Sequence, residues 1–244
     1  MQGKVALVTG GARRVGAAIA RQLHGAGASV LLHYRESEAD AAKLEAELNA
    51  ARARSASKVK AELLAPVAPR ALLSAALDSF GRLDVLVNNA STFFPVAVGA
   101  MESTHWEELI GSNLRAPLFI AQQAAPELAK REGAIVNVID IHADRPLKGY
   151  AVYSIAKAGL AALTRSLALE LAPRVRVNGV SPGAIAWPDD GQFDPAERGR
   201  ILATTPLGRV GSPEDIAQAV HFLATAPYVT GQIIAVDGGR SIFL

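Results

Sequence analysis

VTGGARRVG (residues 8–16) joins a short apolar run, KVALVT (4–9), to a helical segment of about residues 14–25 through a glycine-rich turn. Backbone N–H groups at the start of such a helix bind anions, and the helix dipole adds to the attraction. Gly10 and Gly16 permit a tight turn and close packing. At the first strand–helix junction of an α/β chain, this pattern favours a dinucleotide over an ordinary turn.

Strand-like and helix-like segments alternate beyond this turn. Apolar runs predict strands at 4–9, 29–34, 57–61, 82–90, 133–140, 175–183 and 232–239. Helical patterns occupy 38–50, a segment ending at Phe80, 104–129, 151–172 and 212–225. Continuous apolar strands between helices indicate a parallel sheet covered on both faces. We predict one α/β domain over residues 1–244, with the Gly-, Pro- and Asp-rich segment 184–211 as a loop or lid over the substrate.

Composition excludes several classes of protein. No apolar run reaches the roughly 18–20 residues that span a bilayer, and the N-terminus lacks a signal-peptide pattern, so we expect a cytoplasmic protein without membrane contact. The 244 residues include no cysteine, which excludes disulfide and thiolate chemistry. The net charge is only +2, and the basic stretch 52–60 is expected to be solvated rather than to bind nucleic acid. The histidines show no ligand spacing, so we predict no metal site.

The end of the second predicted strand, HYRES (33–37), indicates which nicotinamide cofactor binds. NAD-binding proteins place a carboxylate there to hold the ribose hydroxyls, whereas this chain has Tyr34, Arg35 and Ser37. An arginine can bind a 2′-phosphate. This pattern favours NADPH, although an ordinary surface arginine is the alternative for Arg35.

Tyr153 and Lys157 stand four residues apart on a predicted helix and therefore share one face. A lysine ammonium there can lower the pKa of the tyrosine, which is ordinarily about 10, and hold the nicotinamide ribose. Asp140 ends the strand before this helix. Two roles are open for Asp140: it is either a catalytic acid or an acid that merely caps a turn.

Taken together, these motifs resemble the short-chain dehydrogenase/reductases. VTGGARRVG, NNA (88–90), Asn113, YSIAK (153–157), SPG (181–183) and VDGG (236–239) stand in that family's order over essentially the whole chain. The resemblance implies a Rossmann-type, doubly wound sheet of about seven parallel strands flanked by helices. It also implies hydride transfer from a nicotinamide, with Asn113, Asp140, Tyr153 and Lys157 as the catalytic set. Asn113 would organise a relay water with Lys157, and the long helices would build a homotetramer.

Four departures from the family pattern resemble the pteridine reductase group. They are Arg14 in the glycine loop, HYRES, NNASTFFP (88–95) and Asp140 in place of the usual serine. The resemblance implies that hydride passes to C6 of a dihydropterin, that Tyr153 protonates N5, and that Asp140 orients the substrate. The implied substrate-binding residues are Arg14, Ser91, Phe93, Asp140, Tyr153 and Trp187. Phe93 would stack on the pterin, and Trp187 would close over it.

The predicted cofactor is NADPH. Its predicted binding residues are Gly10, Arg13, Arg14, Val15, Gly16, His33, Tyr34, Arg35, Ser37, Glu62, Leu63, Asn89, Ala90, Tyr153, Lys157, Pro182 and Gly183. Two other functions stay open at this point: a carbonyl reductase acting on a 3-oxoacyl or other ketone substrate, and a non-catalytic NADP-binding sensor. Asp140 argues against the first, and the intact Tyr153–Lys157 pair argues against the second.

Overall fold

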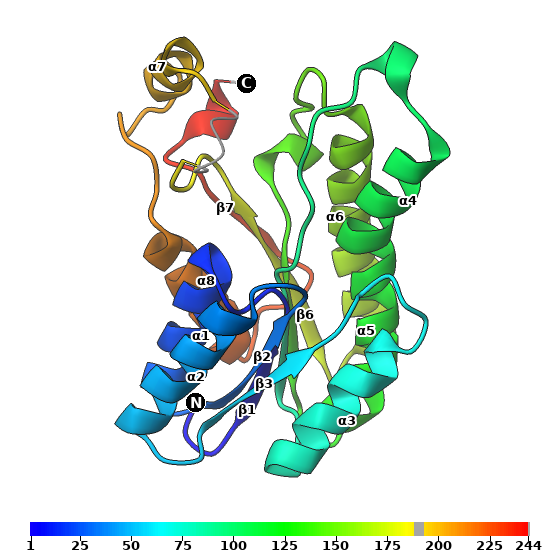
Figure 1. Cartoon of the computed structure of the whole chain (residues 1–244), viewed down its shortest axis with the longest axis vertical. Coiled ribbons are helices and arrows are strands. Elements are labelled where there is room, and N and C mark those ends of the chain that lie inside the picture. The colour runs from blue at the N-terminus through cyan, green and yellow to red at the C-terminus, as the bar shows by residue number, and fades with distance from the viewer. Residues whose placement is uncertain (188–192, 244) are drawn as a thin grey trace.

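The computed structural model describes residues 1–187 and 193–243. Its centre is a sheet of seven parallel strands in the order β3-β2-β1-β4-β5-β6-β7 (Figure 1). The strands are β1 (Val5–Val8), β2 (Ser29–Tyr34), β3 (Ala56–Lys60), β4 (Val85–Asn88), β5 (Ala134–Val138), β6 (Arg176–Pro182) and β7 (Ile233–Val236). This confirms the predicted Rossmann-type doubly wound sheet.

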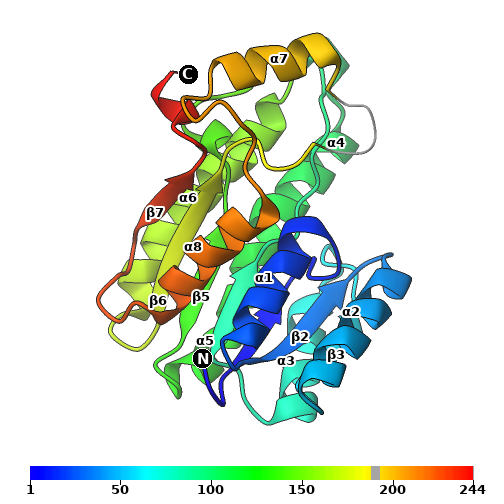
Figure 2. The ribbon, with the colours of Figure 1, turned by 90° about the vertical axis from the view of Figure 1, so that its left-hand side faces the viewer.

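Helices cover both faces of the sheet, and α7 stands apart at its end (Figures 1 and 2). They are α1 (Arg14–Gly25), α2 (Glu38–Ala51), α3 (Ala68–Phe80), α4 (Ser103–Ile110), α5 (Ala116–Ala129), α6 (Ala151–Leu171), α7 (Pro195–Ala203) and α8 (Pro213–Thr225). On one face lie α1, α2 and α8, and on the other α3, α5 and α6 (Figure 1). No helix in the described part of the chain is long and apolar enough to cross a membrane.

The side chains of β1 point alternately to the two faces of the sheet and fill the hydrophobic core on each side. Ala6 and Val8 pack into the core beneath α1 and α8, whereas Val5 and Leu7 pack into the core beneath α3 and α5. Successive side chains of a strand point to opposite faces, so a strand buried on both sides must be apolar throughout. This explains the continuous apolar runs of the sequence.

Strand order reverses between β1 and β4, because the chain passes to one side of β1 first and to the other side afterwards. At such a switch point a crevice opens beyond the carboxyl ends of the strands, where open α/β sheets bind ligands. The ends of β1, β4, β5 and β6 all open on this edge. The glycine turn, the NNA segment, Asp140 and Gly183 follow these four strands directly.

Two predicted elements differ from the structure. The helix predicted over 104–129 is interrupted by a π-helical turn, η2 (Gly111–Arg115), between α4 and α5. The segment 184–211, predicted as loop, contains the helix α7. Asp194 caps that helix by accepting a hydrogen bond from the N–H of Glu197, and Pro195 occupies its first position, which suits proline. Residues 188–192 of the predicted lid lie outside the described residues.

Candidate active site

Tyr153 and Lys157 lie on the face of α6 that packs against the sheet, and both are buried. The Lys157 Nζ donates to the carbonyl oxygen of Val138 at the end of β5, at 3.0 Å. The same nitrogen lies 5.6 Å from the centre of the Tyr153 ring. Helix α6 therefore fixes a cation and a phenol side by side at the edge of the sheet.

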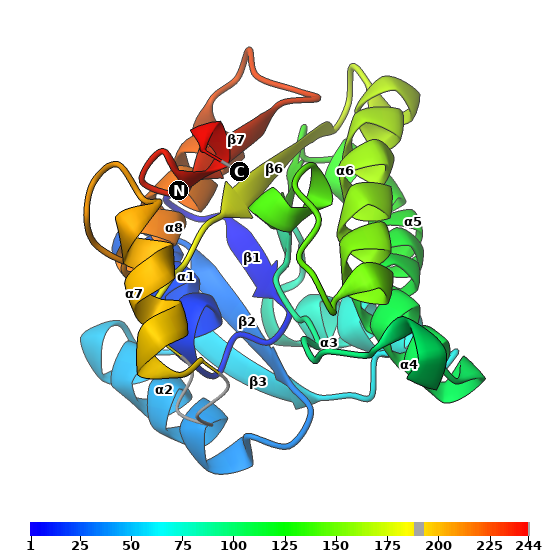
Figure 3. The same ribbon diagram turned by 90° about the horizontal axis from the view of Figure 1, so that it is seen from above.

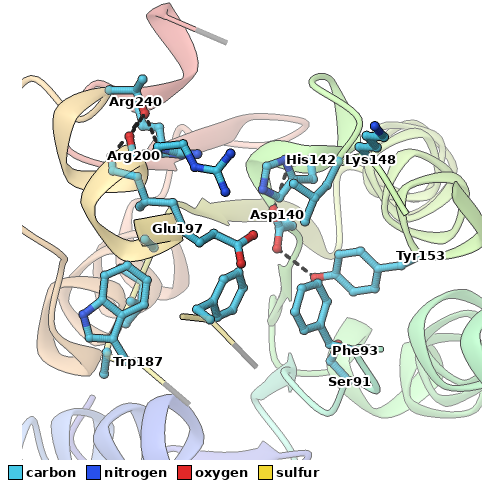
Figure 4. A pocket seen from close by; sticks show the side chains of 18 of the residues that line it. Ser91, Phe93, Asp140, His142, Lys148, Tyr153, Trp187, Glu197, Arg200 and Arg240 are labelled. Atoms are coloured by element: carbon cyan, nitrogen blue, oxygen red, sulfur yellow. Dashed lines mark hydrogen bonds between the residues drawn. The ribbon is translucent and has the colours of Figure 1, made fainter. Parts of the chain in front are cut away.

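Asp140 makes two different hydrogen bonds. Its Oδ2 accepts from the Tyr153 hydroxyl at 2.8 Å, and its Oδ1 accepts from the backbone N–H of His142 at 2.8 Å. The second bond caps the 3-10 turn η3 (Ile141–Ala143). The acid therefore caps a turn, and the same cap holds its other oxygen on the tyrosine (Figure 4). Its catalytic role stays a prediction.

The pKa of Tyr153 corrects an expectation from the sequence. We expected Lys157 to lower it, but the pKa is raised well above 10. Burial is the largest cause, the negative charge of Asp140 is the next, and the hydrogen bond to Asp140 adds to both. Ser91 acts the other way through a hydrogen bond to the phenol. Tyr153 therefore keeps its proton at neutral pH, which suits a proton donor.

Burial acts on Lys157 in the opposite sense. It lowers the pKa of the ammonium group to about 8, while the charge of Asp140 raises it in part. A fully buried cation is disfavoured unless negative charge or hydrogen-bond acceptors compensate. The ammonium form of Lys157 is thus lost at a lower pH than that of an ordinary lysine.

Asn113 lies in the π-helical turn and is completely buried. Its Nδ2 donates to the carbonyl oxygens of Leu109 at 3.0 Å and Thr92 at 2.9 Å. Its Oδ1 accepts from the Ser91 hydroxyl at 2.6 Å. Among the described residues no hydrogen bond joins Asn113 to Lys157, so the predicted relay between these two remains a prediction. The contacts place Asn113 behind Ser91, which in turn reaches Tyr153.

The glycine turn fits a pyrophosphate cradle. A Cβ on Gly16 would lie 2.0 Å from the Gly10 carbonyl oxygen and 2.7 Å from the Asn89 side chain, so only glycine fits there. Asn89 braces the turn by donating to the carbonyl oxygens of Thr9 at 2.9 Å and Gly10 at 3.1 Å. The backbone can thus approach a bound phosphate closely, as a dinucleotide requires.

Arg14 adopts a left-handed backbone conformation, with φ of 48°, at the place where such loops usually have glycine. That conformation is costly for a residue with a Cβ. Its guanidinium donates to the carbonyl oxygen of Ala186 at 2.8 Å. Arg14 therefore ties the glycine turn to the segment after β6, and it lines the cavity that also contains Asp140 and Tyr153.

A cavity of about 230 Å³ brings together nine of the predicted cofactor-binding residues. They are Gly10, Arg13, His33, Tyr34, Arg35, Ser37, Glu62, Leu63 and Ala90. Its two arginines already face carboxylates: Arg13 lies 2.9 Å from Asp40, and Arg35 lies 3.4 Å from Glu36 and 4.0 Å from Glu62. These pairs are exposed and therefore weak, so a phosphate can displace them.

His33 has a structural part within this cavity. It is buried, and its Nδ1 accepts from the Gly10 N–H at 3.1 Å, so its Nε2 is the nitrogen that donates to the Ala61 carbonyl oxygen. Burial lowers the pKa of His33, which keeps the ring neutral. Tyr34 is also buried and packs on Ala12 and Ala41. Both side chains shape the cavity from within the fold.

A larger cavity of about 770 Å³, shown in Figure 4, shares Ser91 with the first. It brings together all six predicted substrate-binding residues: Arg14, Ser91, Phe93, Asp140, Tyr153 and Trp187. Phe93 packs edge-on against Tyr153, with 4.8 Å between ring centres, and stacks on Tyr150 at 4.5 Å. An aromatic wall thus stands beside the only acid–phenol pair that the described part of this cavity contains.

Comparisons with known proteins identify the family of the chain. A family model described as enoyl-(acyl carrier protein) reductase matches residues 10–241. Pteridine reductase 1 of Leishmania tarentolae is 42% identical, with 98% of this chain and 96% of that protein covered. The chain belongs to the short-chain dehydrogenase/reductase family. Further relatives are an uncharacterized oxidoreductase of Methylorubrum extorquens, 39% identical with 98% of each chain covered, and 3beta-hydroxysteroid dehydrogenase 1 of Eggerthella lenta, 34% identical with 100% and 95% covered.

Family membership makes the chain an oxidoreductase and implies a nicotinamide cofactor. Within this short-chain dehydrogenase/reductase, six predicted site residues line neither cavity. Val15, Gly16 and Asn89 belong to the turn and its brace, Asn113 lies behind Ser91, and Lys157 lies beneath Tyr153. Pro182 ends β6, and Gly183 lines the larger cavity.

Sequence analysis missed the residues that α7 contributes to this enzyme. Glu197, Arg200 and Ile201 of α7 line the larger cavity, together with Thr204 at its C-cap and Phe193 from the segment before it. Phe193 lies 6.5 Å from Phe93 and 5.9 Å from Trp187, measured between ring centres. The signal was the sequence DPAE (194–197), a cap followed by proline and an acid, inside a stretch interpreted as loop.

Proposed function

We propose that this enzyme reduces a dihydropterin to its tetrahydro form with NADPH as the hydride donor. The observation that carries the proposal is Asp140, held by its own turn and bonded to the proton donor Tyr153, in a cavity walled by Phe93. A ketone oxygen needs one small hydroxyl donor at this position. A pterin offers several ring N–H and N groups, which a carboxyl can orient. The similarity to a pteridine reductase supports the same substrate class.

The glycine turn and the 230 Å³ cavity would hold the cofactor, with Arg35 toward its 2′-phosphate and Lys157 toward the nicotinamide ribose. When bound, the cofactor supplies the hydride that adds to C6 of the N5=C6 bond. Tyr153 donates its proton to N5, so that hydride and proton together saturate that bond. Asp140 orients the ring and passes a replacement proton from water to the phenol. Lys157 offsets the negative charge that develops on the phenol oxygen.

The preference for NADPH rests on the side chains at the end of β2. Arg35 and Ser37 line the cavity there, and Glu62 at the end of β3 faces the same arginine. A 2′-phosphate would replace an exposed carboxylate at Arg35 and make charge-assisted bonds that the ribose of NADH cannot make.

A carbonyl reductase of the same family is the second candidate, because a hydroxysteroid dehydrogenase is also among the relatives. Replacing Asp140 by serine separates the two. We expect Asp140→Ser to lower kcat/KM for dihydropterins by at least about 100-fold, as loss of a general acid–base group does, while NADPH binding stays within about 3-fold of the original. Asp140→Asn, which keeps the turn cap but not the acid, is the matched control for folding. Undiminished pterin turnover in Asp140→Ser would contradict the proposed role.

We also propose that the enzyme is a homotetramer. Helices α4, α5 and α6 lie side by side on one flank (Figure 1) and present apolar side chains to solvent, among them Trp106, Phe119, Ile155 and Leu169. Exposed large apolar side chains on neighbouring helices favour an interface between copies of the chain. The cytoplasmic location stays a prediction from the sequence.

A further inference from the structure

His33 lies near the end of β2, the strand between β1 and β3 (Figure 3). The residue is only 2% exposed, and it lines the cavity of about 230 Å³. The glycine turn follows the strand on one side of it, and Ala61 and Glu62 follow the strand on the other side. His33 therefore stands between the turn that fits a pyrophosphate and the acid that faces Arg35.

Both N–H groups of the glycine pair in the turn bond this one residue. The N–H of Gly10 donates to the His33 Nδ1 at 3.1 Å, and the N–H of Gly11 donates to the His33 carbonyl oxygen at 2.9 Å. The carbonyl oxygens of Thr9 and Gly10 accept from the side chain of Asn89. The backbone that leads into α1 is thus held through its donors by β2 and through its acceptors by the chain after β4.

The ring of His33 can make both of its side-chain bonds in only one form. Its Nδ1 faces an N–H group and must accept, whereas its Nε2 lies 3.1 Å from the carbonyl oxygen of Ala61 and must donate. Ala61 is held a second time, because its N–H donates to the carbonyl oxygen of Tyr34 at 3.1 Å. The neutral ring, with its proton on Nε2, joins the end of β3 to the glycine turn across β2.

The turn leads into a helix whose first N–H groups have no side-chain cap. Arg13 stands at the N-cap position of α1 without a capping hydrogen bond from its side chain, and the first turn of the helix contains no acid. Uncapped N–H groups at a helix start suit a phosphate. Because the N–H groups of Gly10 and Gly11 are already bonded, a pyrophosphate depends on those of α1, and their position depends on the turn.

We propose that His33 is a positioning residue, which holds the glycine turn in the conformation that a dinucleotide pyrophosphate requires. The inference rests on the nicotinamide cofactor that family membership implies and does not depend on the pterin. Without the Nδ1 acceptor the N–H of Gly10 loses its partner, and the turn rearranges to bring that group to water. Cofactor binding must then restore the turn, which weakens affinity. Since NADPH and NADH share the pyrophosphate, the loss is equal for both.

The experiment separates the two bonds of the ring. In His33→Asn the amide oxygen can take the place of Nδ1 and accept from Gly10, whereas in His33→Gln the amide nitrogen can take the place of Nε2 and donate to Ala61. We expect the dissociation constants of NADPH and NADH to rise together by about 10-fold in His33→Gln, as for a donor left without its acceptor, and to stay within about 3-fold in His33→Asn. The fluorescence of the bound reduced nicotinamide measures both constants without turnover.

The matched control is His24→Gln. His24 is also buried, and its Nε2 bonds the Ser55 hydroxyl at 2.7 Å, but it lines neither cavity. Its replacement should leave both dissociation constants unchanged, and an equal rise there would contradict the inference. Hydrogen exchange reports on the turn itself: the amide of Gly10 should stay protected in His33→Asn and exchange about 10-fold faster in His33→Gln.

Other results also decide the matter. A rise for NADPH alone in His33→Gln would place His33 against the 2′-phosphate end of the cofactor and overturn the inference. An equal rise in His33→Asn and His33→Gln, or no rise in either, would overturn it as well. If His33→Gln does not fold, His33→Asn decides: retained affinity supports the inference, and a 10-fold loss contradicts it. Failure to reduce any pterin would overturn the proposed function and leave these titrations valid.

Discussion

At the scale of single residues, burial governs the chemistry of the site. Tyr153 bonds Asp140 near the end of β5, where Lys157 bonds the carbonyl oxygen of Val138, and burial moves the pKa values of Tyr153 and Lys157 in opposite directions. The phenol stays protonated and the ammonium group loses its proton easily. The charge state of Lys157 is therefore sensitive to pH at lower values than that of an ordinary lysine.

This predicts a basic limb in the pH dependence of NADPH binding. The pKa of Lys157 is lowered to about 8, so the ammonium form dominates below that pH and is lost as the pH rises through it. If only the ammonium form holds the cofactor, kcat/KM for NADPH should fall about tenfold per pH unit well above pH 8. In Lys157→Met the activity should be low and this limb absent. A flat profile up to pH 10 in the unaltered enzyme would show that Lys157 remains charged or is not needed.

Sequence reasoning identified these residues by their order but could not give their environment. Tyr153 and Lys157 are four residues apart, which fixes their common face. The direction of the pKa shift of Tyr153 depends on which neighbour is closer and on how deeply the ring is buried. Both follow from the packing of α6 on the sheet, which spacing does not reveal.

At the scale of elements, two segments differ from the prediction, the π-helical turn and α7. Both lie next to the candidate active site. The π-helical turn at Gly111–Arg115 carries Asn113 inward, where its Nδ2 bonds the carbonyl oxygen of Leu109. Such turns often mark functional positions in helices, but the apolar pattern of 104–129 continues through this one. Helix α7 contains no fully buried residue. Its sequence therefore has no apolar stripe from which a helix could be predicted.

The cap of α7 provides a prediction at this scale. Asp194→Ala removes the bond to the Glu197 N–H and should destabilise the helix by about 1 kcal/mol. Because α7 lies outside the two packed layers, we expect KM for the pterin to rise about 3- to 10-fold while Tm changes by less than about 1 °C. Steady-state kinetics and thermal unfolding measure the two effects.

The matched control is Ser212→Ala, which removes the equivalent cap from α8, where Ser212 accepts from the Asp215 N–H at 3.2 Å. Helix α8 packs on α1 within the core. Here we expect the reverse: Tm lower by about 2–4 °C, the usual shift for 1 kcal/mol at this size, with KM unchanged. A lower Tm in both variants with the same KM would mean that α7 does not shape the substrate site.

At the scale of the whole molecule, the fold could be predicted almost completely. All seven strands and their parallel arrangement follow from apolar runs that alternate with helices, and the strand order places four loops at one edge. The boundaries were less certain. The strand predicted at 82–90 is Val85–Asn88, because Asn89 and Ala90 leave the sheet to bond the Thr9 side chain.

The oligomeric state of the enzyme remains a prediction. If α5 lies in a tetramer interface, Phe119→Asp should disrupt it, because burying an unpaired carboxylate is costly. Light scattering should give about four times the chain mass of 25.5 kDa for the unaltered protein and a smaller mass for the variant. Ala46→Asp, on the exposed side of α2, is the control that should leave the mass unchanged. A monomeric unaltered protein would contradict the proposed tetramer.

The most direct measurement is NADPH oxidation with a small substrate panel: dihydrobiopterin, dihydromonapterin, dihydrofolate and a 3-oxoacyl thioester, each repeated with NADH. Our account predicts turnover of pterin substrates with NADPH, no turnover of the thioester, and much weaker activity with NADH. Turnover of the thioester alone would contradict it and would mean that Asp140 is a tolerated replacement of the family's serine.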